Sequence, residues 1–176
     1  MRLKNIAISV LLLISVLFLS CQKQEQEISV ASQEKSIESF VKSQTGKRVV
    51  LKGGVNRVVI EEGAGDTLAN GDSLILEYAA FIFSSGKGVI FDTNIPEIAT
   101  IAGIDISNSG MANFGIELGT TLLIEGVEIG LTGVRKGEHS YILFSSRFGY
   151  GNKVIGIVPK YSPLIFEVWI KNVKKN

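Results

Sequence analysis

Residues 73–83 alternate in side-chain character over a length that leaves few folds open. One set of alternate positions is apolar throughout, so this face of the segment can be buried while the other stays available for a second contact. Turn-forming sequences flank the segment at residues 70–72 and 84–88. The pattern predicts a central β-strand and a hairpin that returns through residues 89–91. The apolar positions are Leu74, Leu76, Tyr78, Ala80 and Ile82.

Four shorter runs of apolar and β-branched residues predict further strands at residues 55–60, 116–118, 139–145 and 164–173. Between the second and the third, apolar side chains recur at helical spacing, with Glu125 and Glu128 on the opposite face. One sheet packed on one short helix is an α+β arrangement. The apolar face of the helix holds Leu123, Ile124, Val127, Gly130 and Leu131.

The ends of this helix carry capping signals. Thr120 or Thr121 can accept a hydrogen bond from the first turn, and Gly133 can end the helix.

The first twenty residues have the pattern of an export signal. Arg2 and Lys4 precede an apolar run at residues 6–19, which is shorter than the roughly 20 residues that a membrane-spanning helix needs. Such a run fits a secretory signal peptide. It ends before Cys21, the single cysteine of the sequence, in a context similar to a bacterial lipidation site. We expect residues 1–20 to be a signal peptide and Cys21 to be lipidated. The alternative is that Cys21 is a small apolar residue within the signal.

The segment between Cys21 and the first predicted strand has two parts. Residues 21–32 are rich in Gln, Glu, Ser and Lys, which predicts a polar tether. Residues 33–43 place Ile37, Phe40 and Val41 at helical spacing, so residues 33–54 are expected to form an amino-terminal helix and a linker. The folded domain would then cover residues 55–176. Within it, residues 94–112 are expected to form a long irregular loop.

Composition excludes several functions. The net charge is +1, and it becomes −1 without Arg2 and Lys4, so a nucleic-acid partner, which requires a basic face, is not expected. One histidine and one cysteine do not make a metal site. His139 is out of phase with the apolar positions of its strand and is expected to face solvent. No cofactor is expected, and nothing in the sequence demands more than a monomer.

The sequence from residue 71 to 173 resembles FKBP-type peptidyl-prolyl cis/trans isomerases. The resemblance lies in blocks that occur in the family's order and with near-family spacing. The amino-terminal extension and Cys21 also resemble gliding-motility-associated FKBP lipoproteins of Bacteroidetes. The blocks are residues 116–119 (Ile-Glu-Leu-Gly), 123–126 (Leu-Ile-Glu-Gly), 133–138 (Gly-Val-Arg-Lys-Gly-Glu), 147–151 (Arg-Phe-Gly-Tyr-Gly), 157–159 (Ile-Val-Pro) and 164–168 (Leu-Ile-Phe-Glu-Val).

The resemblance implies a twisted antiparallel sheet wrapped around one short helix, with a proline pocket between them. It also implies that the Ile124 N–H and the Tyr150 hydroxyl hold substrate carbonyls, and that Asp92 orients groups at the pocket edge. Leu123 and Val158 would line the adjacent rim. The implied walls are Tyr78, Phe91, Phe114, Ile124, Tyr150 and Phe166.

Three features depart from the family pattern. Val127 stands where the family usually has a tryptophan at the pocket floor, which should weaken proline binding. Residues 94–112 are longer than the usual loop, and could extend a groove, cover the pocket or pack on the body. The single tryptophan, Trp169, falls on the outer face of its strand, where the helix containing Ile37, Phe40 and Val41 could cover it.

The expected function is prolyl isomerisation that assists folding of exported proteins, without a cofactor. Two alternatives remain: a binding or chaperone module with little catalysis, and a docking module of an envelope machine in motility or secretion. The expected location is the cell envelope, through the lipid on Cys21. Gln22 is not the aspartate associated with inner-membrane retention, which favours the outer membrane.

Overall fold

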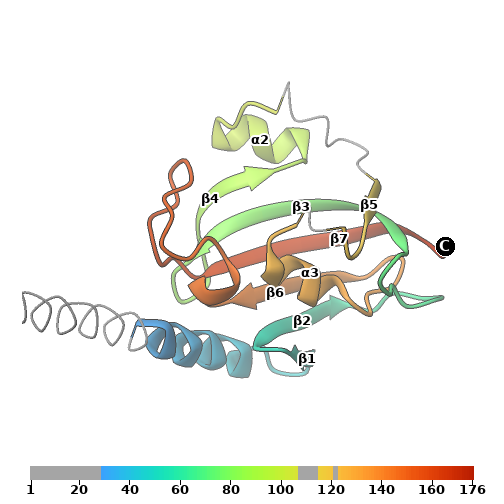
Figure 1. Ribbon diagram of the computed structural model, residues 1–176, viewed down its shortest axis with the longest axis horizontal. Coiled ribbons are helices and arrows are strands. Elements are labelled where there is room, and N and C mark those ends of the chain that lie inside the picture. Colours follow the sequence, from blue (N-terminus) through green and yellow to red (C-terminus); the bar gives the residue numbers. More distant parts are fainter. Residues whose placement is uncertain (1–28, 107–114, 121–122) are drawn as a thin grey trace, which may run out of the picture.

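The computed structural model describes residues 29–106, 115–120 and 123–176. These residues form an antiparallel sheet of seven strands in the order β1-β2-β6-β7-β3-β4, with β5 also paired to β3 (Figure 1). A single sheet with short helices against it is an α+β fold, as predicted. The strands are β1 (Arg48–Lys52), β2 (Val55–Glu61), β3 (Ser73–Phe83), β4 (Lys87–Thr93), β5 (Gly115–Glu117), β6 (His139–Phe144) and β7 (Leu164–Lys174).

The two longest strands lie side by side in the middle of the sheet. β3 and β7 pair from Ser73 opposite Lys174 to Ile82 opposite Leu164, with a register shift between Ile75 and Leu76. The central strand predicted from alternation is therefore confirmed. Its partner β7 belongs to the other end of the folded domain, so the pairing joins segments about 90 residues apart in sequence.

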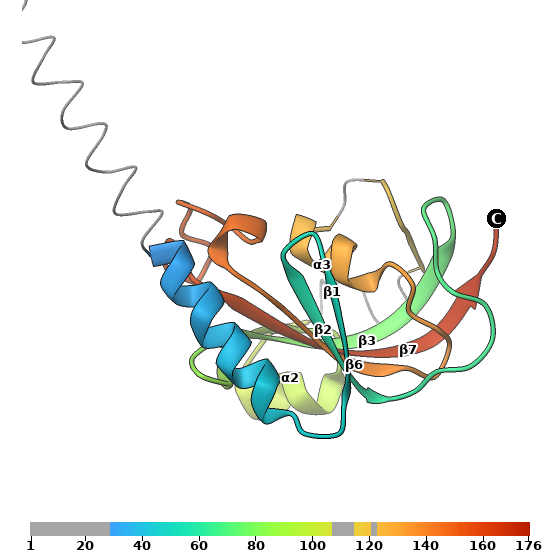
Figure 2. The ribbon, with the colours of Figure 1, turned by 90° about the horizontal axis from the view of Figure 1, so that it is seen from below.

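Helix α3 (Glu125–Leu131) packs on the inner face of the sheet. Two glycines allow this close approach. A Cβ on Gly126 would overlap the Phe144 ring, and one on Gly130 would overlap the Ile142 side chain. Figure 2 shows α3 on one side of the sheet and α2 (Pro96–Ala102) on the other. The buried core between α3 and the sheet includes Leu74, Leu76, Val127, Leu131, Ile142, Phe144, Leu164, Phe166, Val168 and Ile170.

The start of α3 differs from the prediction. Ile124, not Thr120 or Thr121, occupies the N-cap position, and Thr121 lies outside the described residues. The Ile124 carbonyl accepts hydrogen bonds from the N–H groups of Val127 and Glu128 at 2.9 and 3.1 Å. Gly133 has a φ of +81°, and this left-handed conformation ends the helical segment as expected.

The amino-terminal helix covers residues 29–43 within the described part of the chain. Residues 29–32 are therefore helical where a tether was predicted. Its buried Ile37 joins a second core on the outer sheet face. Strands β2, β6, β7 and β3 contribute the other members of this core, which are Val58, Leu143, Ile165 and Phe83.

Two further predictions about local structure are wrong. Residues 48–52 form strand β1, not a linker, and residues 96–102 form helix α2 within the expected irregular loop. Pro96 lies in the first turn of α2, and Gly103 follows its last residue with a φ of +67°. The two residues therefore mark the beginning and the end of a helix. The predicted signal peptide and Cys21 lie outside the described residues.

Trp169 and His139 also differ from expectation. The two residues face each other across β6 and β7, and their rings stack with centroids 4.8 Å apart. His139 Nε2 lies 2.9 Å from Glu167 Oε1, and the His139 side chain is only 14% exposed. His139 is thus packed, not solvated. Ile37 of the amino-terminal helix packs in a core that contains Ile165 and not Trp169. Ile165 and Trp169 share the outer face of β7 but lie four residues apart along it.

Candidate active site

A cavity of about 240 Å³ lies between the start of α3 and the inner face of the sheet. Apolar side chains make up most of its wall, and the polar groups come from a few residues at one side. Its lining residues are Leu76, Tyr78, Asp92, Asn94, Ile116, Leu123, Ile124, Val127, Leu131, Tyr150, Phe166 and Val168. Concave, mainly apolar sites with a few convergent polar groups are typical of ligand-binding pockets.

Aromatic rings form one side of this cavity. Phe166 lies 6.2 Å from Tyr78 and 6.0 Å from Phe91, measured between ring centroids. Phe91 also makes an edge-to-face contact with Tyr150 at 6.2 Å. Phe144 stacks on Phe166 at 5.9 Å on the core side. Such contacts hold each ring against its neighbours, so the wall is preformed.

Asp92 is placed by the pairing of β3 with β4. It lies opposite Ala80, where the register shifts between Ala80 and Phe81. Its Oδ2 accepts a hydrogen bond from the Tyr78 hydroxyl at 2.9 Å. Burial raises the pKa of the Asp92 carboxyl, while the hydrogen bonds from Tyr78 and the Thr93 backbone oppose this rise. The carboxylate is therefore a partly desolvated charge at the cavity wall.

Asn94 fixes the end of β4 beside Asp92. Its Oδ1 accepts a hydrogen bond from the Tyr78 N–H at 2.7 Å, and its Nδ2 donates to the Leu76 carbonyl at 2.9 Å. Thr93 Oγ1 donates to the Tyr78 carbonyl at 2.7 Å. These bonds satisfy backbone groups of β3 where the ladder with β4 ends. They hold Tyr78 and Asp92 in register.

Tyr150 follows the short 3-10 helix η2 (Ser146–Phe148). The Ser146 carbonyl accepts hydrogen bonds from the N–H groups of Gly149 and Gly151 at 3.2 and 3.1 Å. This tight turn aims the Tyr150 ring into the cavity. Burial, and then the charge of Asp92, raise the pKa of the Tyr150 phenol, so the hydroxyl remains protonated and able to donate at neutral pH. Among the described residues, no hydrogen bond uses this hydroxyl.

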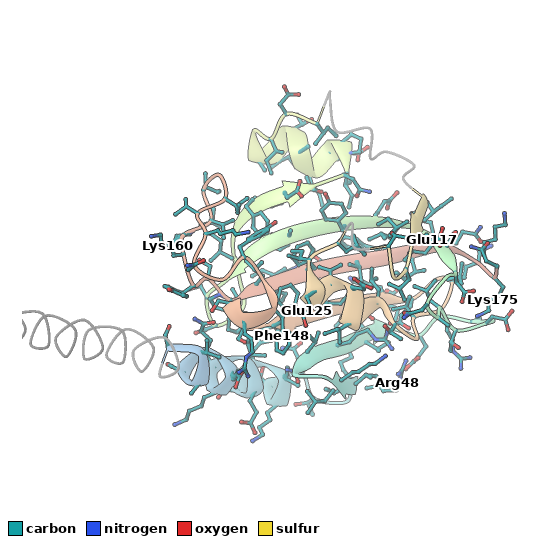
Figure 3. The ribbon with its side chains drawn as sticks, in the orientation of Figure 1. Arg48, Glu117, Glu125, Phe148, Lys160 and Lys175 are labelled. Atoms are coloured by element: carbon teal, nitrogen blue, oxygen red, sulfur yellow. The ribbon has the colours of Figure 1, made fainter. Side chains whose placement is uncertain are left out.

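Ile124 supplies a second polar group at the mouth. Its φ of −64° and ψ of 140° keep it extended just before α3. No hydrogen bond of its backbone N–H is present within the described part of the chain. Figure 3 labels Glu125 at the start of α3 and Phe148 in η2, the elements that place Ile124 and Tyr150.

A buried ion pair anchors the other end of α3. Arg57 Nη1 donates to the carbonyls of Gly130 and Thr132, both at 3.0 Å. Arg57 Nε lies 3.4 Å from Glu138 Oε1, which also accepts the Ser140 hydroxyl at 2.6 Å. A cation at the carbonyl end of a helix satisfies its last acceptors and opposes its dipole. The network fixes α3, and with it Ile124 and Val127.

Most of the predicted site residues meet at this cavity. Phe91 is not a lining residue and supports Tyr150 and Phe166 through ring contacts. Val158 was expected at the rim but is 1% exposed in the core, because the reciprocal backbone bonds between residues 155 and 158 turn it inward. Phe114 lies outside the described residues. The predicted residues that line the cavity are Tyr78, Asp92, Leu123, Ile124, Val127, Tyr150 and Phe166.

Sequence reasoning did not assign the other lining residues to the site. Leu76 shares the face of Tyr78, and Leu131 shares the face of Val127, so periodicity contained a signal for both. Val168 shares the face of Phe166 in the same way. Asn94 carries no comparable signal, since a polar residue after a strand usually indicates a turn. Nothing in the pattern around Ile116 assigned it to the site either.

Val127 lies at the cavity floor, as expected, and is 5% exposed. No cluster of three or more potential metal ligands occurs among the described residues. The helices in that part of the chain include none with the length and hydropathy needed to cross a membrane.

The family model for FKBP-type peptidyl-prolyl cis-trans isomerases matches residues 65–171. The chain therefore belongs to this family, whose established chemistry is rotation about the X-Pro bond. The matched region contains β3 to β6, α3 and the described lining residues of the cavity. Family membership supports a prolyl isomerase function in general.

The relatives of known name include one that is named as inactive. FK506-binding protein 1 of Aspergillus oryzae is 29% identical over 121 residues, covering 65% of this chain and 94% of that protein. The inactive peptidyl-prolyl cis-trans isomerase FKBP6 of Mus musculus is 27% identical over 122 residues, covering 65% of this chain and 31% of that protein. Similarity at this level therefore includes a relative that is named as inactive.

Solved structures agree on the fold. FkpA from Escherichia coli superposes with a TM-score of 0.58 at 22% identity, covering 94% of this chain and 70% of that chain. The N-terminal domain of FKBP42 from Arabidopsis thaliana gives 0.55 at 18% identity, covering 75% and 94%.

Proposed function

We propose that this chain catalyses cis/trans isomerisation of X-Pro bonds in unfolded or exported proteins. One observation carries the proposal. An apolar, aromatic-walled cavity has two hydrogen-bonding groups at its mouth, the Tyr150 hydroxyl and the Ile124 N–H, that no described residue occupies. A proline ring fits the apolar part, and carbonyls flanking the X-Pro bond match the two donors.

The chemistry requires no proton transfer. Amide resonance gives the X-Pro bond a barrier of roughly 18–20 kcal/mol, and uncatalysed rotation takes tens to hundreds of seconds. The planar amide has more charge separation than the twisted transition state, and water favours the planar form. A site that replaces water by apolar side chains therefore favours the twisted form relative to the ground state.

Each polar residue has a role in this proposal. Tyr150 and Ile124 hold substrate carbonyls and orient the bond. Asp92 accepts the Tyr78 hydroxyl, keeps that ring against Phe166 and places a negative charge beside the cavity. The apolar floor formed by Val127, Leu131 and Val168 receives the proline ring.

We further propose that the protein acts at the cell envelope, anchored by lipid on Cys21 and located in the outer membrane. The support is the sequence of residues 1–21 and the resemblance to gliding-motility-associated lipoproteins of Bacteroidetes. Incorporation of labelled palmitate into the full-length chain, but not into a Cys21→Ser variant, is the expected result. Equal labelling of both proteins would contradict the anchor.

A second candidate function is an FKBP-like binding module with little catalysis. Val127 leaves the cavity floor without the aromatic ring usual in the family, and one relative is named as inactive. Such a module would bind proline segments or dock a partner in the envelope without accelerating rotation.

A protease-coupled assay with a proline-containing peptide separates the two candidates. The full-length chain, purified in detergent, should accelerate the slow phase in proportion to its concentration. Asp92→Ala should lower this rate, because the Tyr78 hydroxyl loses its hydrogen bond to Asp92. Turnover at background level together with measurable peptide binding would support the binding module and contradict the isomerase.

A further inference from the structure

The amino-terminal helix approaches the loop that carries Tyr150. Figures 1 and 2 show this helix beside the segment between β6 and β7. It packs on the outer sheet face through Ile37, on the side opposite the cavity core. Its first described turns nevertheless reach beyond the sheet to residues 145–161.

Gln33 bridges the two ends of that loop. Its Oε1 accepts a hydrogen bond from the Ser146 N–H at 2.8 Å, and its Nε2 donates to the Tyr161 carbonyl at 2.8 Å. The partners are 113 and 128 residues away in sequence. Next to this bridge, the Ser145 hydroxyl donates to Glu34 Oε1 at 3.3 Å. One amide side chain thus uses both its donor and its acceptor on the loop base.

Both contacts are continuous with Tyr150. Ser146 begins η2, so its N–H has no partner within that helix, and its carbonyl accepts the Gly151 N–H at 3.1 Å. The Tyr161 N–H donates to the Gly151 carbonyl at 2.7 Å. Gln33 therefore closes a set of hydrogen bonds that ends at the residue next to Tyr150.

The loop contains an unfavourable backbone conformation and a buried N–H group, and contacts from outside the loop stabilise both. Tyr161 has a φ of +56°, a left-handed conformation that is unfavourable for a residue with a bulky side chain. Ser146 is buried, and its N–H would be left without a partner if Gln33 withdrew. Gln33 stabilises the loop conformation in which the Tyr150 ring enters the cavity.

We propose that Gln33 is a positioning residue for the cavity, through which the amino-terminal helix sets the position of the Tyr150 hydroxyl. The inference deepens the proposed function and rests on it for its catalytic consequence. Its structural consequence is independent of catalysis. A displacement of the amino-terminal helix would therefore change the position of the Tyr150 hydroxyl through the hydrogen bonds of Gln33.

The test compares Gln33→Ala, Gln33→Glu and Gln44→Ala in the full-length chain in detergent. Gln44 is a matched control, because within the described part of the chain its side chain hydrogen-bonds only to Phe40 and Ser43, at the other end of the same helix. NMR should show Ser146 amide exchange about tenfold faster in Gln33→Ala, with shifted Tyr150 ring resonances. Amides of β2 and β6 should be unchanged.

Gln33→Glu separates the two contacts. It keeps an acceptor for the Ser146 N–H but cannot donate to the Tyr161 carbonyl when ionised. Ser146 should stay protected, while the Tyr150 resonances still shift. If Gln33→Ala does not fold, this variant carries the test.

Isomerase kinetics provide the second readout. Loss of the bridge should lower kcat/KM by roughly threefold to tenfold, mainly through KM, whereas Gln44→Ala should match the wild type. Unchanged Ser146 exchange and Tyr150 resonances in both Gln33 variants would overturn the inference. Background turnover in the wild type would instead overturn the proposed function, and the NMR comparison would still decide the role of Gln33.

Discussion

The Tyr78 hydroxyl donates a hydrogen bond to Asp92 Oδ2 across 2.9 Å at the cavity wall. Burial raises the pKa of Tyr78, and the charge on Asp92 raises it further. Burial also raises the pKa of Asp92, although the hydrogen bond from Tyr78 opposes this. The pair thus keeps a protonated phenol and a single carboxylate charge in an apolar site, which suits a reaction without proton transfer.

Asp92→Asn should stabilise the fold at neutral pH and lower isomerase activity. The folded-state pKa of Asp92 is raised, so this group favours the fold while protonated, and that contribution is lost as pH rises from the ordinary value of 3.8 through the folded-state pKa. Asparagine keeps an acceptor for Tyr78 without the buried charge. We expect Tm to rise by about 2–4 °C at pH 7 and to match the wild type below pH 3.8.

Thermal unfolding followed by circular dichroism across pH checks this prediction. Asp66→Asn is the control, because Asp66 is exposed and lies outside the cavity. A Tm difference between Asp92→Asn and the wild type that does not change with pH would show that the effect is not due to the carboxyl charge.

Val127→Trp should strengthen proline-peptide binding. Val127 faces the cavity of about 240 Å³, so an indole ring has space there and adds apolar contact. We expect affinity to rise about tenfold, equivalent to about 1.4 kcal/mol, and Val127→Ala to weaken it. Calorimetric titration of one proline peptide into each variant measures the change. A weaker complex with Val127→Trp would show that the cavity does not receive the ring.

Gly130→Ala should destabilise the protein, although alanine is the better helix former by about 0.8–1 kcal/mol. The added methyl would overlap the Ile142 side chain, and overpacking of this kind costs about 1–3 kcal/mol. Tm should fall. Gly115→Ala in β5 is the control for the added methyl group, since a Cβ there meets no atom of the described residues within 4 Å. A higher Tm for Gly130→Ala would mean that helix propensity outweighs the contact with β6.

Periodicity predicted the elements that have a buried face. β3 and β7 carry apolar side chains at alternate positions, and α3 carries them at helical spacing. The residues of the core could therefore be predicted from the sequence. β1 was missed because it has no buried residue. Helix α2 was missed because Pro96 and Gly103 were interpreted as loop residues, although in these positions they begin and end a helix.

The site was predictable only with the family resemblance. Alternation places Tyr78 and Phe166 on an inner face, but it cannot show that a cavity remains beside them. Tyr150 and Asp92 come from turns and strand ends, whose spatial neighbours depend on the whole topology. The contacts of Gln33 with residues 146 and 161 join segments with no shared pattern, so the sequence offered no signal for them.

Removal of the Tyr150 hydroxyl tests the central claim most directly. Tyr161→Phe is the control, because Tyr161 belongs to the same loop and its hydrogen bonds to other described residues all involve its backbone. If the hydroxyl holds a substrate carbonyl, Tyr150→Phe should lower kcat/KM for a proline peptide about fivefold with unchanged Tm, while Tyr161→Phe should not lower it. Equal kcat/KM for wild type and Tyr150→Phe would contradict the account.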